Sequence, residues 1–202
     1  MTTLGRDRQK SIVLDLGCGK GYFTRILSLQ STTIGLDVNK GAVIEAKVEG
    51  GVEKLNQLHL IVADLLSLPF RSHSIDVVVC ASVLEHIRDL DSALKQINDI
   101  LKEDGIFVVG YPIETKFFKL IWRLVSPQNF KFIDQSQTIW YNPFTHKQEC
   151  YWKSPFTHKQ DYQTIRDALG KYFRILRKEK LPFTIFPDLF SYYECLKCAR
   201  DM

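Results

Sequence analysis

Apolar residues in the first half of the chain form short continuous runs, separated by segments with helical spacing. A short continuous apolar run is typical of a strand that is buried on both faces of a parallel sheet. We expect such strands at 12–16, 33–37, 58–63, 75–81 and 106–111. Helical patterns fall between them at 22–29, 42–48 and 94–101. This alternation predicts an α/β fold built on a mostly parallel sheet.

The third helical pattern carries a signal for each of its ends. Asp91 precedes its apolar positions as an N-cap, and Gly105 lies just past the last of them as a C-terminal signal. The strand at 106–111 follows directly.

The pattern changes after Pro112. Residues 111–162 contain 13 of the 24 aromatic residues and all three tryptophans. The hexapeptide Pro-Phe-Thr-His-Lys-Gln occurs at 143–148 and again at 155–160, which we interpret as a local duplication. Regular patterns then return, with a helix expected at 162–169 and strands at 173–176 and 189–196. We expect one domain over residues 1–202, with an aromatic-rich insertion or lid at about 112–160.

The composition is that of a soluble globular protein, with 45% hydrophobic and 25% charged residues. No apolar run approaches the roughly 18 residues of a membrane span, and the polar start of the chain does not resemble a signal peptide. The net charge of +4 does not by itself indicate a nucleic-acid binder. Five cysteines, an odd number with irregular spacing, argue against a disulfide framework. We therefore expect a reducing, cytoplasmic setting.

The sharpest motif is Asp-Leu-Gly-Cys-Gly-Lys-Gly at 15–21, where the first expected strand ends and a helix begins. Glycines permit positive φ and let a ligand approach the backbone, and the helix N-terminus presents unpaired N–H groups. A dinucleotide fingerprint would read Gly-x-Gly-x-x-Gly and would cradle a pyrophosphate. Here the spacing is Gly-x-Gly-x-Gly after an acid, and a carboxylate suits a cationic ligand better. S-adenosylmethionine is such a ligand, since it carries a sulfonium and an ammonium but no phosphate.

Two further acids end the second and third expected strands. Asp37, 20 residues after Gly17, can accept hydrogen bonds from both hydroxyls of a ribose. It can also cap the helix that follows Asn39, and the two roles can coexist. Asp64 can accept from the exocyclic amine of adenine, while Leu65 offers a backbone N–H and an apolar wall. A lone Asp after a strand is more often a turn residue, so the weight of Asp64 comes from its place at the ligand-binding edge of the sheet.

Together these motifs resemble the class I S-adenosylmethionine-dependent methyltransferases, particularly the type 11-like small-molecule group. The matching segments, in the order of the family, are 13–21, 63–70, 74–79 and 83–86. Leu-Lys-Glu-Asp-Gly at 101–105 stands where the family often has Lys-Pro-Gly-Gly, so the proline is missing. The resemblance implies a Rossmann-like, doubly wound, seven-stranded sheet with an antiparallel last strand and helices on both faces.

The resemblance also implies roles for individual residues. Asp15 and the glycine backbone would hold the methionine end of the cofactor, Asp37 the ribose, and Asp64 with Leu65 the adenine. The expected cofactor-binding residues are Asp15, Gly17, Cys18, Gly19, Gly21, Asp37, Val38, Asp64, Leu65, Cys80 and Ala81. The family commonly has helices before the first strand that help to cover the cofactor. Only ten residues precede Ser11, so we expect segment 112–160 to supply that cover.

Methyl transfer from a sulfonium is an in-line displacement with an activated leaving group, so alignment and desolvation can supply much of the rate. We expect no metal site, because Cys195 and Cys198 form a single Cys-x-x-Cys without a second pair. A base is needed only if the acceptor must lose a proton. The candidate bases are Glu85, His86, Tyr111, His146 and His158. Each also has an ordinary structural explanation, so the catalytic group stays open.

Other functions are weighed against this one. A nicotinamide-dependent oxidoreductase would need Gly-x-Gly-x-x-Gly and usually a substrate domain. Nucleic-acid methylation is disfavoured, because Cys-Ala-Ser-Val at 80–83 contains no Asn-Pro-Pro-Tyr-like motif. A non-catalytic cofactor-binding or regulatory protein and a protein methyltransferase both remain open. The expected partner is a small or lipid-like acceptor, while peripheral membrane contact and the oligomeric state are left undecided.

Overall fold

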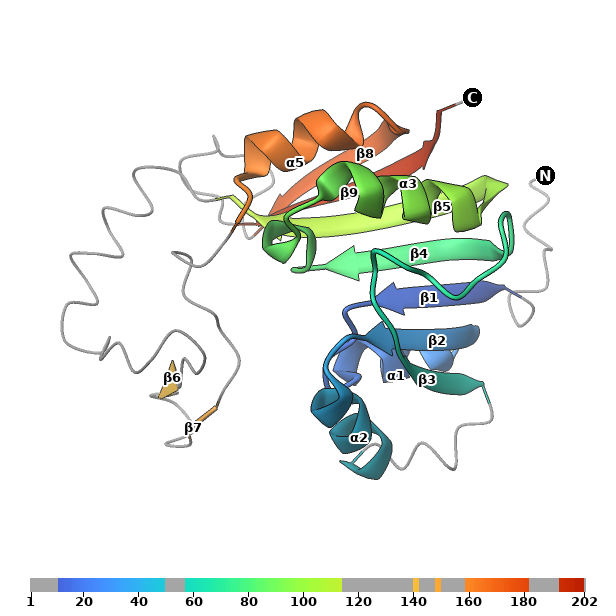
Figure 1. Cartoon of the computed structure of the whole chain (residues 1–202), viewed down its shortest axis with the longest axis vertical. Helices are drawn as coiled ribbons and strands as arrows, with labels where there is room; N and C mark the ends of the chain where they lie inside the picture. The colour runs from blue at the N-terminus through green and yellow to red at the C-terminus, as the bar shows by residue number, and fades with distance from the viewer. Residues whose placement is uncertain are drawn as a thin grey trace.

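The computed structural model describes residues 11–49, 57–113, 140–141, 148–149, 159–181 and 193–201. Seven strands form one sheet in the order β3-β2-β1-β4-β5-β9-β8 (Figure 1). These strands are β1 (Ile12–Leu16), β2 (Thr32–Asp37), β3 (Leu58–Val62), β4 (Ile75–Ala81), β5 (Leu101–Pro112), β8 (Phe173–Leu181) and β9 (Tyr193–Arg200). Strands β1 to β5 pair in parallel, and β9 runs antiparallel to β5 on one side and to β8 on the other. The predicted seven-stranded sheet with an antiparallel last strand is confirmed.

The helices of the described residues are α1 (Tyr22–Ser28), α2 (Lys40–Glu49), the 3-10 helix η3 (Leu84–His86), α3 (Leu90–Ile100) and α5 (Tyr162–Leu169). The chain moves from β1 through β2 to β3 in one direction, and from β4 to β5 in the other. Right-handed crossovers therefore place α1 and α2 on one face and α3 on the opposite face. In Figure 1, α3 and α5 lie together in front of the sheet, and α1 lies behind it. Two short strands, β6 (Trp140–Tyr141) and β7 (Gln148–Glu149), pair antiparallel with each other.

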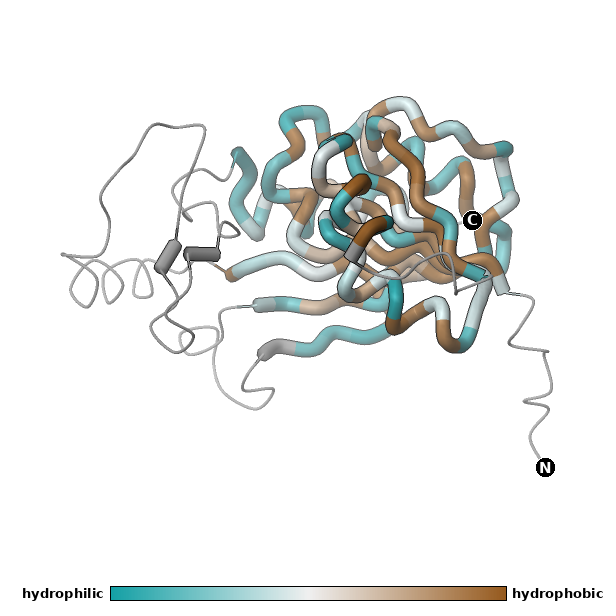
Figure 2. The backbone as a smooth tube through the Cα atoms, turned by 90° about the horizontal axis from the view of Figure 1, so that it is seen from below, coloured by the Kyte–Doolittle hydropathy of each residue, from teal (hydrophilic) through white to brown (hydrophobic). Residues whose placement is uncertain are grey.

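The main core lies between the sheet and the pair α3 and α5. Within it the rings of Phe107 on β5 and Phe173 on β8 pack with their centroids 5.0 Å apart. A smaller cluster on the other face joins Val43 of α2 to Leu58 of β3. In Figure 2 the brown, hydrophobic stretches of the tube gather in the middle of the molecule. Burial on both faces of the central strands explains why they read as continuous apolar runs.

Helix α3 begins at a different cap from the one its sequence predicted. Asp89 is the N-cap, because its side chain accepts a hydrogen bond from the backbone N–H of Ser92 at 3.0 Å. Asp91 lies inside the first turn, where its carboxylate accepts from Lys171 Nζ at 3.1 Å. The assignment of Asp91 as the cap was wrong, since the side chain that faces the free N–H groups belongs to the acid two residues earlier.

Strand β5 starts directly after α3 and contains a bulge. The register with β4 shifts between Ile75 and Val77, so that residues 102–105 lie opposite Asp76 alone. Gly105 therefore belongs to the bulge, and our interpretation of it as the end of α3 was wrong. A Cβ at this position would lie 2.9 Å from a backbone carbonyl oxygen of the same bulge, which explains the glycine.

Strands β8 and β9 extend beyond the predicted ends of 176 and 196, because they pair with each other as far as Leu181 and Arg200. β8 is an edge strand, so charged residues such as Arg177 interrupt its apolar pattern without ending it. The predicted start of the last strand at 189 lies outside the described residues. So does nearly all of the expected insertion at 112–160, whose role as a lid stays a prediction.

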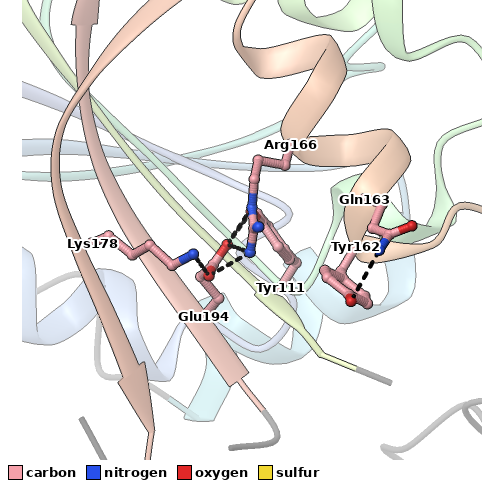
Figure 3. A network of polar contacts seen from close by, with 6 residues as sticks. All are labelled: Tyr111, Tyr162, Gln163, Arg166, Lys178 and Glu194. Atoms are coloured by element: carbon pink, nitrogen blue, oxygen red, sulfur yellow. Dashed lines mark hydrogen bonds and ion pairs between the residues drawn. The ribbon is translucent and has the colours of Figure 1, made fainter. Parts of the chain in front are cut away.

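A buried carboxylate joins β5, β8, β9 and α5. Glu194 of β9 is 0% exposed, and its Oε1 accepts from the Tyr111 hydroxyl at 2.7 Å and from the Arg166 guanidinium at 2.8 Å (Figure 3). Its Oε2 lies 2.8 Å from the ammonium of Lys178. Burial alone raises the pKa of this carboxyl, but the hydrogen bonds from Lys178, Tyr111 and Arg166 outweigh it and hold the pKa below its ordinary value. Charge-assisted bonds from three elements thus fix the start of β9.

Replacing Arg166 with Met should lower the free energy of unfolding by about 3 kcal/mol, because it removes one partner of a buried charge. Tyr111→Phe should cost about 1.5–3 kcal/mol, the scale of a hydrogen bond to a charged group. Urea unfolding measures both. The matched control is Lys171→Met, which removes an exposed ion pair with Asp91 and should cost less than about 1 kcal/mol. Equal costs for the two cation variants would show that Glu194 does not depend on Arg166.

The contribution of Glu194 to stability should also depend on pH. Because its pKa is lower in the folded than in the unfolded protein, the stabilisation is present above the unfolded value near 4.5 and is lost as the pH falls below it. In Glu194→Gln this part of the acid dependence should disappear from unfolding curves taken between about pH 6 and pH 3.

Candidate functional site

The glycine turn connects β1 to α1 at the carboxyl edge of the sheet. Gly17, Gly19 and Gly21 have φ values of 71°, 52° and 71°, which side chains other than glycine rarely adopt. The backbone N–H groups of Gly17 and Cys18 donate to the carbonyl of Leu36 at 2.7 and 3.0 Å, so the turn is fixed to the end of β2. A Cβ at Gly19 would meet no atom of the described residues within 4 Å, so these residues leave open space above the turn.

Asp15 is the acid below this turn. It is 4% exposed, and its Oδ2 accepts a hydrogen bond of 2.6 Å from the Thr24 hydroxyl of α1. Burial raises the pKa of Asp15 to about 6, assisted by the charge of Asp37 and opposed by the bond from Thr24. Burial and the same two acids raise the pKa of the Cys18 thiol to about 12, so it stays protonated at neutral pH. The base of the turn is therefore a place where a cation would be favoured.

Asp37 ends β2 beside the turn. Its Oδ2 accepts from the backbone N–H of Gly19 at 2.8 Å, and its Oδ1 accepts from that of Asn39 at 2.8 Å. The side chain of Asn39 in turn accepts from the backbone N–H groups of Gly41 and Ala42 at the start of α2. The capping that we considered for Asp37 is thus carried by Asn39, and Asp37 is held against the glycine turn.

Asp64 and Leu65 follow β3. Asp64 Oδ1 accepts from the backbone N–H of Leu66 at 2.9 Å, which forms the turn that a lone Asp was expected to make. Leu65 is 6% exposed and packs in the main core. Its expected role as an apolar wall beside the adenine stays a prediction.

The end of β4 approaches the glycine turn closely. A Cβ at Gly17 would lie 2.2 Å from Val83 Cγ2, so the two segments touch where only a hydrogen fits. Cys80 is fully buried, and burial raises the pKa of its thiol, whereas Ala81 is exposed at the edge. Ser82, with φ 57°, lies in the left-handed region although it is not a glycine.

Two of the candidate bases lie in η3, directly after β4. Glu85 is 2% exposed, and His86 beside it is half-buried. The backbone carbonyl of Glu85 accepts from the N–H groups of Lys159 at 2.8 Å and of Gln160 at 3.2 Å. The end of the second hexapeptide copy thus docks on η3, close to the carboxyl edge.

Tyr111 is unsuited to act as a base. It is 0% exposed, its hydroxyl donates to Glu194, and burial together with this bond raises its pKa. A base must be able to take a proton near the working pH and within reach of the acceptor. Of the other candidates, His146 and His158 lie outside the described residues.

Sequence reasoning missed four residues around the site, namely Thr24, Ser82, Val83 and Tyr193. Ser82 Oγ lies 3.1 Å from the hydroxyl of Tyr193, which is 111 positions further along the chain. No local pattern signals such a contact. In the part of the chain that the structure describes, no helix is long and apolar enough to cross a membrane, and no three metal-binding side chains cluster.

Residues 14–109 match a family model described as a methyltransferase domain. The human protein named arginine-hydroxylase NDUFAF5, mitochondrial, is 36% identical over 101 residues, which are 50% of this chain and 28% of that protein. Demethylmenaquinone methyltransferase of Staphylococcus haemolyticus is 31% identical over 140 residues, which are 63% of this chain and 56% of that one. The chain thus spans between about a quarter and just over half of these two relatives.

Among solved structures, the N-methyltransferase NodS of Bradyrhizobium japonicum in complex with S-adenosyl-l-homocysteine has the same fold. The TM-score is 0.65 at 14% identity, over 96% of this chain and 80% of that one. The family match covers β1 to β5 and therefore includes the glycine turn and the acids at the ends of β1, β2 and β3. By these segments and by its fold, the chain resembles the S-adenosylmethionine-dependent methyltransferases, and residues 14–109 match their methyltransferase domain.

Proposed function

We propose that this protein transfers the methyl group of S-adenosylmethionine to a small or lipid-like acceptor by direct in-line displacement. The observation that carries the proposal is the arrangement of Asp15 and Asp37 around the glycine turn. One carboxylate is buried below the turn, and the other is held against the N–H of Gly19. Two acids beside open space suit a ligand with a cationic end and a ribose, and do not suit a pyrophosphate.

The residues present fit this cofactor. The backbone of 17–21 and the carboxylate of Asp15 would hold the methionine end, and Asp37 the ribose hydroxyls. Asp64 and the exposed Val38 would border the adenine, while the backbone at Cys80 and Ala81 would meet the amino group. Leu65 would offer its backbone N–H and the apolar edge of a side chain that packs in the core.

The cofactor supplies a methyl group on a sulfonium, an already activated leaving group. The protein's residues therefore need to align the acceptor and exclude water, and no covalent intermediate is required. Glu85 and His86 of η3 remain the described candidates for removing a proton from the acceptor, and His158 stays a prediction.

The name of the staphylococcal relative supports a small or lipid-like acceptor. The name of the human relative is that of a hydroxylase, so the cofactor-binding half does not by itself specify the reaction. Cofactor binding without turnover and methylation of a protein are the alternatives, which incubation with labelled S-adenosylmethionine and candidate acceptors separates. The reducing, cytoplasmic setting also remains a proposal, and the four described cysteines are free thiols.

Asp37→Ala should weaken the binding of S-adenosylhomocysteine by about 1.5–3 kcal/mol, or roughly 10- to 150-fold, because it removes hydrogen bonds to a charged group. Calorimetry measures this. Asp99→Ala is the matched control, because Asp99 accepts from Ser72 at a distance from the turn and should leave binding unchanged. Tight binding of NAD without any response to S-adenosylhomocysteine would refute the cofactor assignment.

Affinity for S-adenosylmethionine should rise with pH between about 5 and 7. A cation bound near Asp15 favours its ionised form, so below the pKa of about 6 binding must release a proton. The rise should be at most about tenfold per pH unit and should flatten above the pKa. By the same linkage the ligand-free protein should lose stability as the pH rises through this window, because the folded state binds this proton more tightly than the unfolded one.

Asp15→Asn should remove this pH dependence while keeping an oxygen that accepts from Thr24. Calorimetric titrations at several pH values compare the two proteins. An unchanged slope in Asp15→Asn would assign the proton to another group.

Gly17→Ala should destabilise the fold by about 2–4 kcal/mol, from backbone strain and from overlap with Val83. Adding Val83→Ala should recover the part that is due to the overlap. In Gly19→Ala the new Cβ would contact no atom of the described residues, so the free energy of unfolding should fall only by the backbone strain. The variant should still bind S-adenosylhomocysteine more weakly, because its Cβ enters the open space above the turn. Thermal unfolding together with calorimetry checks this contrast, and wild-type binding in Gly19→Ala would contradict it.

A further inference from the structure

Two hydroxyl groups meet at the carboxyl edge of the sheet, next to the proposed cofactor site. Ser82 follows β4, and Tyr193 begins β9. Ser82 Oγ and the Tyr193 hydroxyl are 3.1 Å apart, and either can be the donor. Neither residue has a role in the cofactor site described above.

The strand register places this pair on the same face as Asp15. Asp15 pairs with Val79, and Val79 pairs with Val108. Aligned residues of neighbouring strands in a sheet share a face. Ala81 and Gly110 lie two residues beyond Val79 and Val108 on the same strands, so they share this face and also pair with each other. The ring of Tyr193 lies over Gly110. The hydroxyl pair therefore lies on the α1 face of the sheet, beyond the acid that we assign to the methionine end.

Ser82 is held in place by its neighbours on both sides. Its backbone N–H donates to the carbonyl of Gly110 at 2.9 Å, and the next residue, Val83, touches Gly17. Its φ of 57° is uncommon for a residue with a side chain, and such conformations concentrate at functional sites. The strained turn leaves Ser82 exposed, with its hydroxyl directed at Tyr193.

Tyr193 is fixed as firmly. A Cβ at Gly110 would lie 2.6 Å from the Tyr193 hydroxyl oxygen, so the glycine makes the room that the ring occupies. Tyr193 pairs with Pro112 on one side and Leu181 on the other. The next residue, Glu194, is buried on the opposite face with the three partners shown in Figure 3. The phenol is therefore presented next to a firmly anchored residue of β9.

We propose that the Ser82–Tyr193 hydroxyl pair binds the methyl acceptor through a neutral oxygen, a hydroxyl or carbonyl group on an otherwise apolar molecule. This inference rests on the proposed function, because it assigns the acceptor side of the same site. Tyr193 is an acceptor-binding residue in this scheme, and Ser82 is its partner.

The chemistry of the pair selects for such an oxygen. Of the two hydroxyl protons, one lies in the mutual hydrogen bond and the other is left to donate to a ligand. Burial, opposed by the bond to Ser82, raises the pKa of Tyr193 to about 12, so the phenol stays protonated over the physiological range. The two hydroxyls are uncharged, and the cations Arg166 and Lys178 are bonded to Glu194. A carboxylate would therefore form no ion pair with the two hydroxyls, and it gains less binding energy there than a neutral oxygen.

The test uses the whole chain saturated with S-adenosylhomocysteine, with 1-naphthol as the probe of a neutral oxygen and 1-naphthoate as its charged counterpart. Calorimetry should show binding of 1-naphthol. Tyr193→Phe should weaken that binding by about tenfold, the order of one net hydrogen bond. Tyr172→Phe, whose hydroxyl contacts Asp91 elsewhere, is the matched control and should change nothing.

Ser82→Gly provides an independent variant, because glycine accepts the positive φ and only the hydroxyl is lost. It should weaken 1-naphthol binding as Tyr193→Phe does, and the double variant should be no weaker than Tyr193→Phe alone, since the hydroxyls act as a pair. Binding of S-adenosylhomocysteine should stay within about twofold in every variant.

Absence of 1-naphthol binding, equal binding by wild type and both single variants, or a preference for 1-naphthoate would each overturn the proposal. Failure of the wild-type protein to bind S-adenosylhomocysteine would instead refute the proposed function, so the two failures are distinguishable.

Discussion

The contact between Gly17 and Val83 is the constraint on which the site depends. Val83 Cγ2 occupies the place that a side chain at Gly17 would need, so the loop after β4 can lie directly on the turn after β1. The turn is tied on its other side to Leu36 by two backbone hydrogen bonds. The ends of three neighbouring strands are thereby fixed relative to one another. Asp15, Asp37 and Ser82 project from this fixed edge, so their pre-organisation is a property of the backbone.

The same closeness creates an electrostatic cost that a ligand can relieve. Bringing Asp15 under the turn buries a carboxylate near Asp37, and its raised pKa records the unfavourable environment. The bond from Thr24 offsets only part of this. A cation at the open side of the turn would stabilise the ionised form of both acids, so the ligand-free site already favours a positively charged ligand. A pyrophosphate would meet the opposite sign, which is why the acid before the glycines is informative.

The strands and the strand-end acids could be predicted from the sequence because both follow from local rules. Burial on two faces gives continuous apolar runs, and parallel strands bring their carboxyl ends to one edge. The cap of α3 was predicted wrongly because two residues satisfied the same capping rule. Asp89 and Asp91 could each cap α3, and only the side-chain geometry chooses. The burial of Leu65 and the pairing of Ser82 with Tyr193 depend on how distant segments pack, which no window of sequence contains.

The antiparallel last strand explains how an anchor and a binding group can be adjacent in sequence. Because β9 runs against β5, its first residues lie at the carboxyl edge, where a parallel strand would place its last ones. Successive side chains of a strand point to opposite faces, so Glu194 enters the core side while Tyr193 faces the site. The buried carboxylate bonds to three elements and fixes the backbone one residue from the phenol. A flexible start to this strand would let the ring leave Gly110 and separate the two hydroxyls. The bonds of Glu194 on one face of β9 therefore keep the uncharged hydroxyls of Ser82 and Tyr193 together on the other face.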